Sequence, residues 1–136
     1  MAKTWGLAEA FASFDGARGK NPRWSWSART PNGKTVVTTF WQDQFDYKTK
    51  PISYAGISET GSEAWLRRPG NSERLENLIY SQDYCDGLLR VVITVAEDVN
   101  ADPRKIADCF PQPKMQMRIT YLNRSTGEFR AELVER

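Results

Sequence analysis

The stretch that decides the fold is residues 23–41, which read RWSWSARTPNGKTVVTTFW. Apolar and polar side chains alternate over residues 23–29, and this pattern predicts a half-buried strand. An Asn32-Gly33 turn follows, and residues 35–41 are rich in β-branched and aromatic side chains. Two such segments on either side of an Asn-Gly pair predict a β-hairpin. The residues expected to share the core-facing side of its first strand are Trp24, Trp26 and Ala28.

Three segments outside this hairpin are expected to be helices, and in the first two of them apolar side chains recur at helical spacing. The second of them is expected to begin at Asn71 or Ser72, because both are good N-cap residues. The third is expected to begin at Asp102, with Pro103 in its first turn. The predicted helices cover residues 5–14, 72–84 and 102–110.

Three further segments have the pattern of strands. Residues 88–95 are almost all apolar, which predicts a central strand covered on both faces. Residues 114–122 and 129–133 alternate and flank a short polar turn, so they predict a second hairpin. The side chains expected on one face of its first strand are Met115, Met117, Ile119 and Tyr121.

The order of these elements predicts an α+β domain. We expect an antiparallel or mixed β-sheet with two or three short helices on one side, and a partial, PUA-like barrel is one arrangement that this order allows. Residues 42–61 predict another short strand or a long loop, and residues 64–67 a strand or a helical turn. With no internal repeat or linker, the 136 residues are expected to form a single domain.

Composition excludes several classes of chemistry. The chain has no histidine, which removes Ser-His and Cys-His nucleophilic pairs, and its two cysteines, Cys85 and Cys109, are too few for a structural zinc site. No cofactor is therefore expected. No apolar stretch is long enough to cross a membrane and no export signal is visible at the N-terminus, so we expect a cytoplasmic protein with reduced thiols and no membrane partner.

Positive charge is concentrated in the first third of the chain. Residues 1–50 carry eight Lys and Arg against four Asp and Glu, whereas residues 51–100 carry four against eight. Flexible glycine backbone, cationic side chains and flat aromatic faces are what proteins use to hold nucleic acid. The residues expected to contact phosphates in the segment 16–29 are Arg18, Lys20, Arg23 and Arg29.

A second phosphate site is expected at Arg67 and Arg68, which precede the predicted helix 72–84. Trp41 or Trp65 is expected to stack on a base, whereas Trp24 and Trp26 are expected in the core. The resulting hypothesis is a non-enzymatic nucleic-acid-binding module. DNA or RNA, paired or unpaired, and a flipped or modified base all remain open.

Two other classes of function are compatible with the sequence. The first is a small regulatory or protein-interaction module of phage or bacterial type, which would bind a protein partner through an exposed aromatic patch. The second is a metal-dependent nuclease built on Asp43, Asp46 and Lys48. The segment 35–41 supplies no upstream carboxylate for such a centre, so the pattern favours binding over catalysis.

Overall fold

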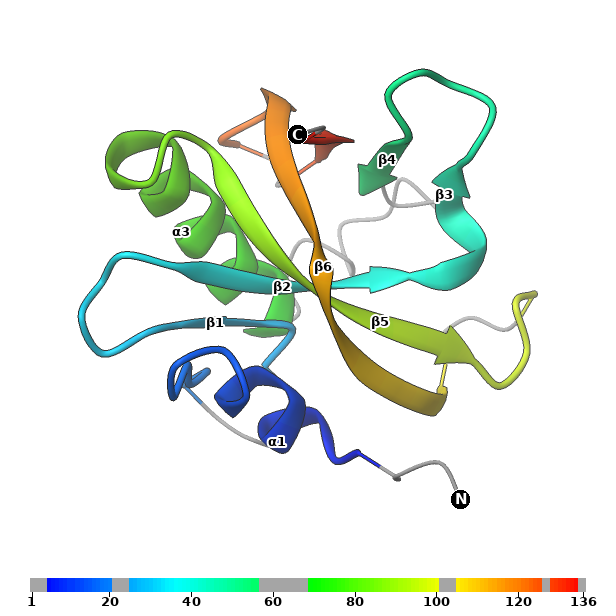
Figure 1. Cartoon of the computed structure of the whole chain (residues 1–136), viewed down its shortest axis with the longest axis horizontal. Coiled ribbons are helices and arrows are strands. Elements are labelled where there is room, and N and C mark those ends of the chain that lie inside the picture. The colour runs from blue at the N-terminus through cyan, green and yellow to red at the C-terminus, as the bar shows by residue number, and fades with distance from the viewer. Residues whose placement is uncertain (1–4, 21–24, 57–68, 101–104, 126–127, 135–136) are drawn as a thin grey trace.

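The computed structural model (Figure 1) describes residues 5–20, 25–56, 69–100, 105–125 and 128–134. It is an α+β fold with one seven-stranded mixed sheet in the order β1-β2-β5-β6-β7-β4-β3. Only β2 and β5 pair in parallel, and every other neighbouring pair is antiparallel. In chain order the elements are α1 (Leu7–Ala12), β1 (Ser27–Arg29), β2 (Val36–Trp41), the 3-10 turn η1 (Gln42–Gln44), β3 (Phe45–Asp46), β4 (Ser53–Gly56), α3 (Pro69–Tyr84), β5 (Leu88–Ala96), β6 (Ile106–Leu122) and β7 (Phe129–Leu133).

Both predicted hairpins are confirmed. In the first, Ala28 of β1 pairs with Val37 of β2, and the turn between the strands places Gly33 at a φ of +71°, which glycine adopts without strain. In the second, β6 pairs with β7 over five register positions. The predicted central strand is also confirmed, because β5 lies between β2 and β6 with side chains buried on both faces.

The sheet is strongly curled but not closed. The Phe40 ring on β2 lies 6.2 Å from the Phe129 ring on β7, although two strands separate β2 from β7 in the sheet. In a flat sheet three strand spacings would hold them about 14 Å apart. The curl therefore brings rings from distant strands into one core, while β1 and β3 form the two unjoined ends of the sheet.

The two described helices cover opposite faces of the sheet, whereas helices on one side were predicted. Val36 belongs to the core cluster that contains Leu78 of α3, and the next residue, Val37, belongs to the cluster that contains Phe11 of α1. Successive residues of a strand point to opposite faces, so α3 lies inside the curl and α1 outside it. Figure 1 shows the β1–β2 hairpin between the two helices.

The predicted helix over residues 102–110 is wrong for its described part. Residues 106–110 belong to β6, where Phe110 pairs with Ile93 and Cys109 with Thr94 of β5. Pairing with a buried neighbouring strand outweighs the local signals of a helix start. The helix predicted over 72–84 is confirmed, but it begins at Pro69, so Asn71 and Ser72 are inside it rather than at its N-cap.

The predicted alternation of the first strand is only partly right. Ser25 and Ser27 are buried, although they were expected to face solvent. Trp26 lies in a bend before β1, and its ring is 5.2 Å from the guanidinium of Arg74 on α3. It therefore does not share a face with Ala28, which packs toward α1. Trp24 is outside the described residues.

Both cysteines are free thiols, and burial raises the pKa of each. We expect Cys85 and Cys109 to react slowly with a thiol reagent at neutral pH in the folded protein, and rapidly in denaturant. Because folding raises the thiol pKa, the unfolded chain loses its thiol protons first, so the free energy of unfolding should decline as pH rises from the unfolded thiol pKa through the folded one. Rapid labelling of Cys109 in the native protein would contradict this burial.

Candidate functional site

Arg18, in the first part of the predicted basic segment, forms an isolated antiparallel bridge at the edge of β1. The backbone of Arg18 exchanges two hydrogen bonds with that of Arg29, at 3.0 and 3.1 Å. This pairing exposes the Arg18 side chain and places residues 17–19 across from α1. Arg23 is outside the described residues. Of the four predicted phosphate contacts in this segment, the structure therefore describes Arg18, Lys20 and Arg29.

Lys20 is held by the first turns of α3. Its ammonium lies 2.6 Å from the Glu76 carboxylate, and its backbone N–H donates to the carboxylate of Glu73, which is buried. The hydrogen bond and charge of Glu76 raise the pKa of Lys20. Two carboxylates thus oppose the positive charge of this loop and reduce its attraction for phosphate.

Arg29 is tied to the same helix. Its Nη2 donates to Asn77 Oδ1 at 3.0 Å, and its guanidinium lies 3.7 Å from the centroid of the Tyr80 ring. Asn77 in turn donates to Ser27 Oγ at 2.8 Å within the buried seam between α3 and β1. These contacts make Arg29 a docking residue for α3, with its guanidinium plane covered by a ring.

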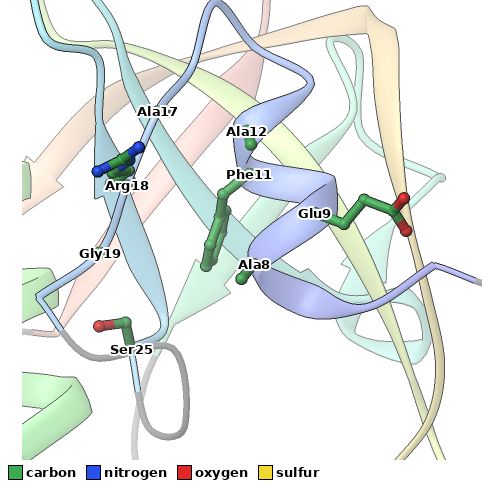
Figure 2. A pocket seen from close by; sticks show the side chains of 8 residues that line it. All are labelled: Ala8, Glu9, Phe11, Ala12, Ala17, Arg18, Gly19 and Ser25. Atoms are coloured by element: carbon green, nitrogen blue, oxygen red, sulfur yellow. The ribbon is translucent and has the colours of Figure 1, made fainter.

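A groove of about 530 Å³ lies between α1 and the segment 17–19. Figure 2 shows the Phe11 ring between the helix and this segment, and the Glu9 side chain turned away from it. Its lining is mostly small and apolar, without a cluster of charges that would bind a polyanion. The lining residues are Ala8, Glu9, Phe11, Ala12, Ala17, Arg18, Gly19 and Ser25.

Of the other predicted contacts, Trp41 is described, and it does not join this segment. Trp41 is half-buried against the core at the far end of β2, where its backbone N–H donates to Tyr54 Oη at 3.1 Å. Trp65, Arg67 and Arg68 are outside the described residues.

One of the two carboxylates considered for a metal binds the backbone of its own turn. Asp46 Oδ1 accepts a hydrogen bond from the Lys48 N–H at 2.9 Å, which is a turn contact. Asp43 lies in η1, at the end of β2. Over the described part of the chain, no three His, Cys, Asp or Glu side chains gather as a metal site would require.

A cationic surface that the sequence reasoning missed lies on the outer side of the curl. Arg118 is exposed between the buried Met117 and Ile119, and Arg130 is exposed between the buried Phe129 and Ala131. Arg90 is half-buried between Leu89 and Val91 in the same way. The alternation of each strand therefore turns all three guanidiniums away from the inner core. We call this surface the open face, and it consists of Arg90, Gln116, Arg118, Tyr121, Arg130 and Glu132.

The three arginines form a diagonal line across β5, β6 and β7. Arg90 pairs with Gln116, two residues before Arg118, and Arg118 pairs with Glu132, two residues after Arg130. Diagonal neighbours of this kind have side chains about 7–8 Å apart. The α1 helix packs over the other half of this side, on Val92 and Cys109, and in Figure 1 the last part of β6 extends away from it.

Exposed tyrosines lie on three different elements rather than in one aromatic patch. They are Tyr47 after β3, Tyr84 at the end of α3 and Tyr121 on β6. No helix among the described residues is long and apolar enough to span a membrane. Comparison with protein-family models, curated proteins and solved structures finds no match to this chain.

Proposed function

We propose that this chain binds nucleic acid through the open face, without catalysis. The observation that carries the proposal is the diagonal of Arg90, Arg118 and Arg130 on one side of three neighbouring strands. Guanidinium groups present several donors to a phosphate and keep their charge at all physiological pH values. A row of guanidinium groups can bind successive phosphates of one nucleic-acid backbone.

The electrostatic setting of this row differs from that of the predicted loop. In the described part of the chain, no carboxylate forms an ion pair with any of the three arginines, whereas Lys20 of the loop is paired with Glu76. Glu132 shares the open face and pairs in register with Arg118, so the local charge remains positive but moderate. This favours a weak, salt-sensitive contact over tight binding of an isolated phosphate ion.

The loop and the open face are separate surfaces. Four strand spacings of about 4.8 Å, or roughly 19 Å along the sheet, separate the Arg18 segment from β6. Binding on the open face therefore does not require Arg18 or Lys20. This separation allows a test in which equal charge is removed from each surface.

The Arg118→Ala/Arg130→Ala variant is expected to lose about tenfold in affinity or more for a labelled oligonucleotide, because two charge-assisted hydrogen bonds are removed. The slope of log affinity against log salt should become shallower by about 2. Fluorescence anisotropy over a salt series measures both quantities.

The matched control is Arg18→Ala/Lys20→Ala, which removes the same charge at the edge of the sheet. It is expected to bind like the parent. If this control loses affinity and the open-face variant does not, the binding surface is the loop and the open-face proposal is wrong. If neither variant changes the affinity, phosphate contacts at both surfaces are excluded.

A further inference from the structure

The exposed Tyr121 differs from the two other exposed tyrosines in its surroundings. The ring of Tyr47 lies 5.9 Å from that of Phe45, and the ring of Tyr84 lies 4.9 Å from that of Tyr80. Tyr121 is 49% exposed, and within the described residues its ring has no aromatic or cationic contact. About half of its surface is therefore open to a planar group.

A β-bulge in β6 determines which face of the sheet the Tyr121 ring occupies. The register shifts between Ile119 and Tyr121, so that Thr120 and Tyr121 together oppose Arg130 of β7. In a regular strand without the bulge, alternation would place Tyr121 on the same face as Ile119, inside the curl. The bulge moves it to the outer side, which is a known effect of bulges on side-chain direction.

The bulge thereby places an aromatic face next to a guanidinium. Residues directly opposite across an antiparallel pair have Cβ atoms about 4.5–5.5 Å apart, so the side chains of Tyr121 and Arg130 are neighbours. A phosphate on Arg130 would bring the base of the same strand within reach of the Tyr121 ring. Arg118, the diagonal neighbour of Arg130, would bind the adjacent phosphate of the nucleic-acid strand.

We infer that the ligand of the open face is single-stranded nucleic acid, with one unpaired base stacked on Tyr121. The inference rests on the proposed function. In a duplex the base faces are stacked on one another, and only an unpaired base offers its face to an aromatic side chain. Every base has such a face, so the contact requires no particular sequence.

The test compares Tyr121→Ala and Tyr121→Phe on a single-stranded oligonucleotide and on a duplex of equal length. Tyr121→Ala is expected to lose roughly 5- to 150-fold in affinity for the single strand, the range for one stacked base. Tyr121→Phe keeps the ring and should bind the single strand like the parent. Neither variant should change the weaker binding to the duplex. Tyr84→Ala, which removes an exposed ring from α3, is the control and should also bind like the parent.

The outcomes separate this inference from the proposed function. If Arg118→Ala/Arg130→Ala loses affinity while Tyr121→Ala binds the single strand like the parent, stacking is overturned and the phosphate surface stands. Equal or tighter binding of the duplex also overturns the single-strand inference. If the parent protein binds neither oligonucleotide, both proposals are wrong.

Discussion

Replacing Phe40 with alanine is expected to lower the free energy of unfolding by about 3–5 kcal/mol. The side chain is fully buried, and three rings surround it. These are Phe45 on β3 at 5.7 Å, Tyr54 on β4 at 4.7 Å and Phe129 on β7 at 6.2 Å between centroids. Phe40 thus joins β2 to the opposite end of the curled sheet, where no backbone–backbone hydrogen bond links the described residues of β2 to β3 or β4. Its loss would leave a cavity at the contact that maintains the curl.

Chemical denaturation followed by tryptophan fluorescence or circular dichroism measures this change. Phe40→Leu fills most of the space and should cost less than about 1.5 kcal/mol. Tyr47→Ala is the exposed control, because its ring is 62% exposed and contacts the same cluster only at its edge through Phe45. A loss below about 1 kcal/mol in Phe40→Ala would show that the ring cluster does not hold the sheet together.

The sequence predicts the hairpins of this fold, which form between neighbouring segments, but not the pairing of strands that are distant in the chain. The Asn32-Gly33 turn and the strands beside it carry their own signals, as does the second hairpin. The parallel pairing of β2 with β5 joins segments separated by more than forty residues, and no local pattern encodes it. The run Val36-Val37 places one apolar side chain on each face of β2, but a single sequence does not show which helix covers which face.

The sequence analysis expected cationic side chains to bind the ligand, but it placed them in the segment 16–29 and not on the open face. The cationic loop is where the sequence indicated, but the acids that oppose Lys20 come from α3, 53 and 56 residues away. The outward positions of the second hairpin include Arg118 and Arg130, and alternation alone could have revealed them. Tyr121 was predicted on the opposite face because alternation ignores the bulge at Thr120. A one-residue shift in register reverses the direction of every side chain beyond it.

Gly19→Ala is the second substitution expected to have a large effect, with a loss of about 1–3 kcal/mol in the free energy of unfolding. A Cβ at this position would overlap Ser25 Cβ, and it would lie 2.5 Å from Ser25 Oγ and 2.8 Å from the backbone oxygen of Ser27. Both distances are far inside van der Waals contact, so residues 17–19 would have to move away from β1. The Arg18–Arg29 backbone pairing and the Lys20–Glu73 hydrogen bond would be weakened together.

The cause can be isolated with a second substitution, because Ser25 supplies the two shortest of the three contacts. Gly19→Ala/Ser25→Gly should recover part of the lost stability. The recovery should be incomplete, because the new methyl group would still overlap the backbone oxygen of Ser27. Gly6→Ala is the spatial control, since an added Cβ there meets nothing within 4 Å and should cost less than about 1 kcal/mol as an N-cap change. Additive losses in the double variant would show that the segment is not packed against Ser25. Since three strand spacings separate the Arg18 segment from Arg90, the nearest residue of the open face, none of these changes should alter the affinity for a single strand as long as the protein stays folded.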